Sequence, residues 1–300
     1  MKRISLSRSA RQILEGYLLI SPSLIVIFAI VIFPLGYLVA SSIYGWSFGT
    51  ITEFVGLKNY IDVFQDPDFW TVFKNTLIFS LVSSSIELLL GLGIASLLDK
   101  SGKFEGILRI IVIMPFMVSM VAGSVSFKWI LNAEFGIVNY SLMNLGLIRS
   151  PVNWLGSSGL AMFACIAVVT WHTTPFVTLI LLAGIKSIPR ELYEVSELDG
   201  AGIYQKFLFI TLPLLKPAIF VSLLIRTMYS LRNFDIPFAL TAGGPGISTK
   251  LMAMLLQERK IQLLFGYNSA LSIIMVIVTL IIVWIYVKGL RVELVREGKT

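Results

Sequence analysis

Four charged side chains interrupt long apolar runs of this sequence, and they are the first candidates for chemistry. Glu87 lies alone in one run, whereas Arg226, Arg232 and Asp235 share another. Ionised groups in apolar surroundings are costly, so they usually face a polar cavity or an oppositely charged partner. Two interpretations stay open: a polar path for a solute, or ion pairs between helices, and for Glu87 we favour a helix–helix anchor. Arg232 and Asp235 are also close enough in sequence to pair on one helix face.

Two aromatic residues could line the same path, namely Trp171 and Tyr229, although a tryptophan within an apolar run more often packs. His172 is the only histidine, and with Pro175 nearby it could hydrogen-bond kinked backbone rather than transfer protons. Cys165 is the only cysteine and lies in an apolar stretch, where a small buried or lipid-facing side chain is expected. These counts exclude a disulfide framework and leave little room for a metal centre.

A phosphate-binding loop of the pattern Gly-x-x-x-x-Gly-Lys-Ser/Thr is missing from the sequence. Gly102-Lys103 is followed by Phe104, and Gly298-Lys299-Thr300 lacks the upstream glycine. The chain should therefore not bind ATP phosphates. Since no nucleophile–base set stands out either, we expect no catalytic residue, no metal and no cofactor in this chain.

The elements that hold these residues are expected to be transmembrane helices. The 300 residues are 56% hydrophobic and only 14% charged, whereas soluble domains carry about 25% charged residues. Six segments are long and apolar enough to cross a hydrocarbon core, which takes about 20 helical residues. The predicted spans are residues 17–40, 77–98, 107–127, 160–185, 213–240 and 263–287. We therefore expect an all-α membrane protein with one transmembrane domain over residues 1–300.

The positive charges predict the orientation of these spans. With the N-terminus in the cytoplasm, the inner segments hold 15 Lys and Arg residues and the outer segments hold seven. The bias places both termini in the cytoplasm. The net charge of +7 follows this arrangement and does not suggest nucleic acid. The basic start at Lys2, Arg3, Arg8 and Arg11 precedes an apolar run that is too long for a cleaved signal peptide.

Aromatic residues are frequent in two predicted outer segments, 51–70 and 129–154. Such side chains settle at the membrane–water boundary. We expect short interfacial helices there, which could also meet an external partner. Prolines that should kink the spans are Pro34, Pro115, Pro175 and Pro237.

The predicted cytoplasmic loop 186–212 is patterned as helix, turn, helix. Ser187 can cap the first helix, and Pro189 suits its first position. Gly200 is placed to end that helix in a left-handed conformation. A second short helix should follow from about Ile203 to Ile210.

Apolar side chains alternate with charges along both arms of this loop, and such a surface favours binding to a partner groove. They are Leu192, Val195, Leu198, Tyr204 and Phe207. The alternative is an amphipathic hairpin that lies on the membrane or packs against its own helix ends.

The same loop resembles the EAA loop of permease subunits in binding-protein-dependent ABC importers. The matching residues are Glu194, Asp199-Gly200-Ala201, Phe207, Ile210 and Leu212-Pro213. Val195 and Ser196 replace the two small residues that usually follow the glutamate. Further stretches resemble sugar-importer permeases related to the larger maltose permease and the first glycerol-phosphate permease. These are Ser21-Pro22-Ser23, Gly56-Leu57-Lys58-Asn59-Tyr60, Trp171 to Phe176, and Thr241 to Pro245.

This resemblance implies the type I ABC importer permease fold in the cytoplasmic (inner) membrane of a bacterium or archaeon. It implies a second homologous permease subunit, two ATPase subunits that bind ATP and Mg²⁺, and an extracytoplasmic solute-binding protein that delivers a sugar. Residues implied to contact the ATPase are Glu194, Asp199, Gly200, Ala201, Tyr204 and Phe207. Candidates for the translocation path are Glu87, Trp171, Arg226, Tyr229, Arg232 and Asp235. The alternative function is a secondary transporter or channel that works without ATPase subunits.

Overall fold

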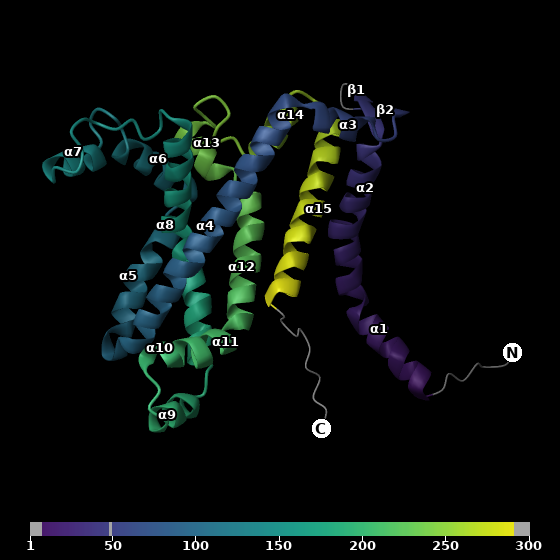
Figure 1. Cartoon of the computed structure of the whole chain (residues 1–300). Coiled ribbons are helices and arrows are strands. Elements are labelled where there is room, and N and C mark those ends of the chain that lie inside the picture. The colour runs from purple at the N-terminus through teal and green to yellow at the C-terminus, as the bar shows by residue number, and fades with distance from the viewer. Residues whose placement is uncertain (1–7, 48–49, 291–300) are drawn as a thin grey trace. The chain divides into compact units, whose positions relative to one another are not determined.

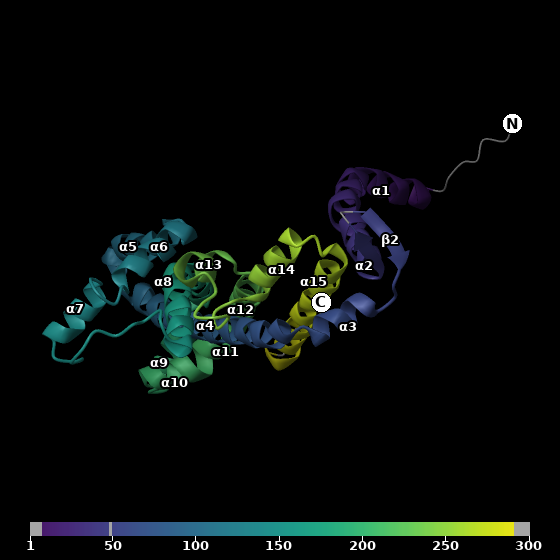
Figure 2. The ribbon, with the colours of Figure 1, turned by 90° about the horizontal axis from the view of Figure 1, so that it is seen from above.

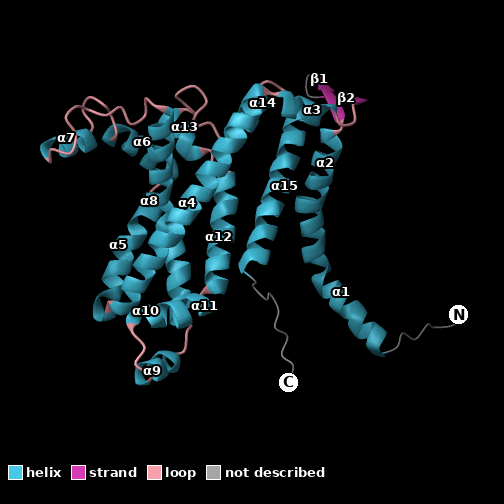
Figure 3. Ribbon diagram, viewed as in Figure 1, coloured by secondary structure: helices cyan, strands magenta, loops and turns pink. Residues whose placement is uncertain are grey.

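The computed structural model describes residues 8–47 and 50–290, which fold into two compact units. One unit comprises Met1–Phe64 with Arg259–Met275, and the other comprises Gln65–Glu258 with Val276–Thr300. Figure 3 shows that the described chain is helical apart from loops and two short strands, so the expected all-α class needs this small correction. Terminal cations that were used to predict the orientation lie outside the described residues; they are Lys2, Arg3, Arg291, Arg296 and Lys299.

The first unit begins with a long apolar helical segment and continues into a β-hairpin. Its elements are α1 (Arg8–Ile27), the π-helical turn η1 (Phe28–Ile32), α2 (Phe33–Ser42), β1 (Tyr44–Ser47), β2 (Thr50–Phe54) and α3 (Lys58–Gln65). Asn59 donates hydrogen bonds from Nδ2 to the carbonyls of Ser42 and Tyr44, at 2.8 and 3.0 Å. The Ser42 and Tyr60 hydroxyls are 2.8 Å apart. These bonds hold α3 against the hairpin. Segment 51–70 thus contains the expected short helix, α3, and in addition most of β2 and the first residues of α4; its interfacial position remains a prediction.

The second unit is a helical bundle with short helices at both ends. Its elements are α4 (Pro67–Lys100), the 3-10 turn η2 (Gly102–Phe104), α5 (Glu105–Met117), α6 (Met120–Ile130), α7 (Ile137–Asn144), α8 (Ser158–Lys186), α9 (Arg190–Leu198), α10 (Ile203–Lys206), the π-helical turn η3 (Phe207–Thr211), α11 (Leu212–Leu214), α12 (Lys216–Leu231) and α13 (Asp235–Thr241). Two helices complete the chain, α14 (Met252–Ile261) and α15 (Phe265–Leu290).

Helices α4, α8 and α12 form the centre of the second unit. Figures 1 and 2 show them side by side, and each packs against the other two. Glycine allows the closest approach: a Cβ on Gly91 of α4 would lie 2.8 Å from Val177 Cγ1 of α8. Likewise, a Cβ on Gly184 of α8 would lie 2.7 Å from Ala218 Cβ of α12. In Figure 1 the short helices α9 and α10 lie at one end of this bundle, and α7 and α13 lie at the other.

Four of the described helical segments are long and apolar enough to cross a membrane, and two bent pairs raise the number to as many as six. The four segments are Gly16–Ser42, Pro67–Lys100, Ser158–Lys186 and Phe265–Gly289, and they contain the predicted spans 17–40, 77–98 and 160–185 and most of 263–287. A total of six spans remains a prediction, as does the single domain over residues 1–300.

The other two predicted spans, 107–127 and 213–240, are not continuous helices. Helices α5 and α6 meet at 89°, because Val118 and Ser119 adopt extended backbone angles shortly after Pro115. The segment Ile203–Leu214 meets α12 at 63°, and α12 ends at Leu231 before α13 begins. In an apolar environment each such break frees backbone groups that need another partner.

The segment between α6 and α8, which the charge bias predicts to be on the outer side, is organised by one side chain. Asn139 is buried, and its Nδ2 donates to the carbonyls of Asn132, Ala133 and Val152. Its Oδ1 accepts from Val152 N and from Trp154 Nε1 at 3.0 Å. The segment therefore has a defined structure that includes one short helix, α7; its interfacial position remains a prediction.

Candidate functional site

Helix α9 ends in the conformation that the sequence predicted. Gly200 has a φ of +78°, which places it in the left-handed region. The amide of Ala201 donates to Ser196 O at 2.9 Å, and the amide of Gly200 donates to Glu197 O at 3.0 Å. These two bonds form a Schellman motif, which satisfies the last carbonyls of the helix. The direction of the chain after α9 is thereby fixed.

The second arm runs from Ile203 to Leu214 and is tied to the first by side chains. Lys206 Nζ lies 2.6 Å from Glu197 Oε1, and the hydroxyls of Tyr193 and Thr211 are 2.9 Å apart. Gln205 Oε1 accepts a hydrogen bond from the Gly202 amide at 2.8 Å. We call residues 190–214 the coupling hairpin; its internal bonds give it a defined shape of its own.

Ser187 and Pro189 differ from the sequence expectation. Ser187 follows the last residue of α8, and its hydroxyl donates to Gly184 O at 2.7 Å, so it does not cap α9. Pro189 precedes the first helical residue, Arg190, and does not occupy that position.

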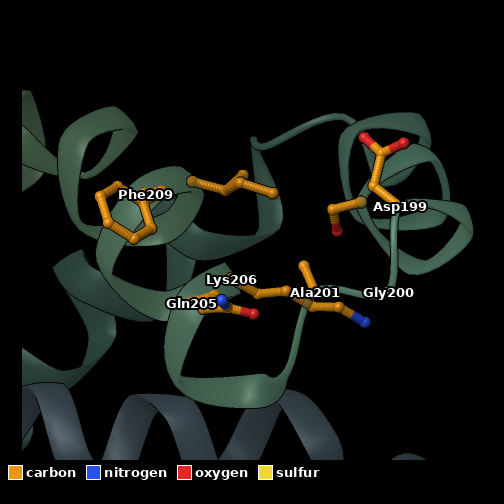
Figure 4. Close-up of a pocket in the computed structure, with 8 residues that line it drawn as sticks. Asp199, Gly200, Ala201, Gln205, Lys206 and Phe209 are labelled. Atoms are coloured by element: carbon orange, nitrogen blue, oxygen red, sulfur yellow. The ribbon is translucent and has the colours of Figure 1, made fainter.

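Large apolar side chains of the coupling hairpin are not covered by other described parts of the chain. Leu198 is 89% exposed and Tyr204 is 74% exposed, and Val195 is exposed as well. This contradicts the alternative in which these side chains pack on the protein's own helix ends. Between the arms lies a pocket of about 350 Å³, lined among others by Asp199, Gly200, Ala201 and Gln205 (Figure 4).

Phe209 and Ile203 are exposed hairpin residues that sequence reasoning missed, whereas Phe207 is half-buried. The π-helical turn from Phe207 to Thr211 explains the difference for Phe209. A π turn aligns residues four to five apart, so Phe209 comes to the same side as Tyr204. The run Phe207-Leu-Phe-Ile-Thr211 contains no sequence signal for this register.

Glu87 and Arg226 form a buried ion pair between α4 and α12. Arg226 Nε lies 2.6 Å from Glu87 Oε2, and its Nη2 lies 3.0 Å from Glu87 Oε1. Thr173 of α8 donates its hydroxyl to Glu87 Oε1 at 2.6 Å. Glu87 is 0% exposed and Arg226 is 6% exposed. Of the two interpretations left open by the sequence, a polar path or ion pairs between helices, the second describes Glu87 and Arg226.

Arg232 and Asp235 do not pair with each other among the described residues, so that expectation was wrong. Helix α12 ends at Leu231 and α13 begins at Asp235, so the two residues do not share one helix face. Both are exposed, and Arg232 donates from Nε to Met228 O at 3.3 Å. Its guanidinium carbon lies 6.0 Å from the ring centroid of Tyr229, which is 64% exposed. Arg232, Asp235 and Tyr229 thus form an exposed group of charged and aromatic side chains at the end of α12.

Trp171 and His172 both contact the bent helices α5 and α6. Trp171 meets Phe127 edge-on, with ring centroids 5.1 Å apart. His172 Nε2 lies 2.8 Å from Val118 O, at the bend itself. Because a carbonyl only accepts, His172 carries its proton on Nε2 and satisfies backbone that the bend has freed. His172 therefore does bond to backbone at a bend, but at the bend that follows Pro115 and not at Pro175, where the expectation placed it.

Known proteins resemble this chain over most of its length. The family of binding-protein-dependent transport system inner membrane components matches residues 87–288. The trehalose/maltose transport system permease protein MalF of Thermococcus litoralis is 40% identical, over 91% of this chain and 92% of the relative. The sulfoquinovosyl glycerol transport system permease protein SmoG of Agrobacterium fabrum is 36% identical, over 93% of this chain and 91% of the relative. The chain belongs to the family of binding-protein-dependent transport system inner membrane components.

A solved structure shows the same fold. A chain of a bacterial ABC transporter involved in the import of the acidic polysaccharide alginate superposes with a TM-score of 0.78 and 24% identity, over 96% of this chain and all of the other. The expected type I ABC importer permease fold is consistent with this likeness. The chain is thus a membrane permease component of an ABC transporter.

Proposed function

We propose that this chain is the permease subunit of an ATP-driven importer that carries a sugar or glycoside into the cytoplasm. The named relatives support the substrate class, since their names specify trehalose and maltose in one case and sulfoquinovosyl glycerol in the other. Trehalose and maltose are uncharged, whereas sulfoquinovosyl glycerol is a sulfonate. We therefore define the proposed substrate class by its sugar unit and leave its charge open.

The observation that carries this proposal is the coupling hairpin. It is internally bonded, ends α9 at Gly200, and exposes apolar residues such as Leu198, Tyr204 and Phe209. An exposed apolar surface on a defined helical element favours a groove in another protein. In our proposal an ATPase subunit supplies that groove, and Glu194, Asp199, Gly200, Ala201, Tyr204 and Phe207 belong to the contact.

The remaining partners follow from this role. Two ATPase subunits would bind ATP and Mg²⁺, and closure of their dimer would displace the hairpins of this chain and of a second permease subunit. A binding protein on the outer side would deliver the sugar. We place the complex in the cytoplasmic membrane of a bacterium or archaeon, with both termini of this chain in the cytoplasm.

For the translocation path we propose the exposed group at the end of α12, with Tyr229, Arg232 and Asp235, together with Trp171. Aromatic faces pack against sugar rings, and the charged groups can hydrogen-bond sugar hydroxyls. Glu87 and Arg226 were candidates for the same path. Because they pair with each other and are buried, we leave them out of the proposed path.

Uptake of labelled sugar into proteoliposomes tests the function directly. The complete complex with its binding protein should accumulate sugar only when ATP is present on the ATPase side. Vesicles that hold the two permease subunits without the ATPase subunits should show no uptake above protein-free vesicles. Uptake of equal rate in both preparations would make the chain a secondary transporter or channel and refute the proposal.

A further inference from the structure

The buried ion pair has a geometry that suits transmission of movement better than binding of a ligand. Both oxygens of Glu87 are occupied, by Arg226 and by Thr173, and the carboxylate has no exposed surface. Arg226 also reaches Ser230 Oγ at 3.3 Å. A solute would have to displace existing bonds to reach either group. The bonds of Glu87 and Arg226 therefore join α4, α8 and α12 to one another.

Its position relates it to the coupling hairpin. The second arm of the hairpin passes into α12 at Leu215, and Arg226 lies about 15 Å further along that helix. Near the hairpin, Leu215 and Ala218 pack against Gly184 of α8, so closely that a Cβ there would lie 2.7 Å from both. Helix α12 is thus held at two levels, by close packing next to the hairpin and by the ion pair in the middle of the helix.

We propose that Glu87 and Arg226 are positioning residues that make α4, α8 and α12 move as one body when the coupling hairpin is displaced. This inference rests on the proposed function. Apolar packing alone allows neighbouring helices to slide, whereas a bidentate pair fixes both distance and orientation. Displacement of α12 would then carry α4 and α8 with it, while the bend between α5 and α6 absorbs the difference.

The test compares transport with ATP hydrolysis in the complete complex. Replacing both charges, Glu87→Gln with Arg226→Met, leaves no unpaired buried charge, so assembly should be kept. We expect stimulated ATP hydrolysis near the wild-type rate and about tenfold less sugar transported per ATP, within the range usual for coupling between distant sites. A purely structural role would lower hydrolysis and transport together, in proportion to the assembled complex.

A matched control removes the ion pair between Lys250 and Glu258, which are 2.7 Å apart and do not join α12 to a neighbour. Lys250→Met with Glu258→Gln should leave the sugar transported per ATP unchanged. If the first double variant does not assemble, Thr173→Val decides, since it removes the bond from α8 to Glu87, together with a bond to Val169 O inside α8, and should lower the ratio about threefold. The positioning role would be refuted by a wild-type amount of sugar transported per ATP in the Glu87→Gln, Arg226→Met variant or, if that variant does not assemble, in Thr173→Val. Loss of ATP dependence in the wild-type complex would instead refute the proposed function.

Discussion

At the scale of single residues, Gly200 shows most directly how local chemistry fixes a functional element. Its φ of +78° lies where a side chain costs about 1–2 kcal/mol, and more for a β-branched residue. Nothing lies within 4 Å of the position that a Cβ would take, so the constraint is conformational and not steric. The glycine is needed for the direction in which the chain leaves α9.

We predict that Gly200→Val separates ATP hydrolysis from transport. The strained turn should displace the second arm while the bundle stays intact, so the complex should assemble yet transport severalfold less sugar per ATP. The control is Gly202→Val: Gly202 has a φ of −71° and only Gln205 Oε1 within 4 Å of its Cβ position. Sugar uptake and phosphate release measured on the same vesicles check both variants. Equal ratios for the two would contradict the role of the turn.

At the scale of elements, close helix contacts decide where the bundle tolerates change. Gly91 and Gly93 lie two residues apart on α4 and differ in their surroundings. A Cβ on Gly91 would lie 2.8 Å from Val177 Cγ1, whereas a Cβ on Gly93 would meet nothing within 4 Å. The side of α4 at Gly91 therefore packs too closely against α8 to accept a Cβ, whereas the side at Gly93 has room for one.

Gly91→Ala should destabilise the protein by about 1–3 kcal/mol, the usual cost of overpacking. Gly93→Ala should be neutral or slightly stabilising, because alanine is the better helix former. Thermal unfolding of the purified complex in detergent gives the comparison, with the two variants as each other's control. A melting temperature for Gly91→Ala at or above that of Gly93→Ala would show that α4 and α8 adjust freely.

The segment around α7 is a second element with a single organising residue. Asn139→Ala removes both the donor and the acceptor at its centre and leaves buried backbone groups unpaired, at about 1–3 kcal/mol for each group. Hydrogen exchange should therefore accelerate in residues 131–157 and stay unchanged in α8. Asn139→Asp, which keeps the acceptor, should have an intermediate effect. Unchanged exchange in Asn139→Ala would mean that the segment is held by other contacts.

At the scale of the whole molecule, apolar runs predicted the existence of the long helices but not their breaks. Composition marked 107–127 as one span, and Pro115 indicated a kink. The sequence did not indicate that the bend would reach 89° at Val118. At this bend the carbonyl of Val118 is bonded by His172, which belongs to a helix far away in sequence. Likewise, Arg226 pairs with Glu87 of α4 in addition to its bond to Ser230 on its own helix, and no local sequence pattern predicts the contact with α4.

The coupling hairpin was predicted in more detail because its signals are local. Gly200 and the residues around it belong to one short stretch, and their types predicted the turn that ends α9, whereas the predicted start of that helix at Ser187 and Pro189 was wrong. The π-helical turn was missed, since aromatic and aliphatic residues such as Phe207 and Phe209 suit an α-helix and a π-helix equally well. Local conformation followed from the sequence, whereas register and long-range pairing did not.

The side of the membrane on which the hairpin lies can be measured with one engineered cysteine. Cys165 is buried, so Leu198→Cys in the otherwise unchanged chain offers one accessible thiol. A membrane-impermeant maleimide should label it from the cytoplasmic side in permease vesicles that lack the ATPase subunits. Labelling should fall when those subunits are bound. Labelling from the outer side would reverse the predicted orientation.

The long helices differ in how much of their surface meets other parts of the chain, and this bears on biosynthesis. In Gly16–Ser42 none of the most apolar 18-residue window is buried, and its mean hydropathy is 2.7. In α8 the buried share is 72% and the mean hydropathy is only 1.8, and Thr170, His172 and Thr173 are among its residues. The helix Gly16–Ser42 can move from the insertion machinery into the bilayer without a partner helix, because all of its sides are compatible with lipid. Helix α8 should partition into lipid more readily beside α4, where Glu87 bonds Thr173, and beside the bend between α5 and α6, where Val118 bonds His172, since both are synthesised before it.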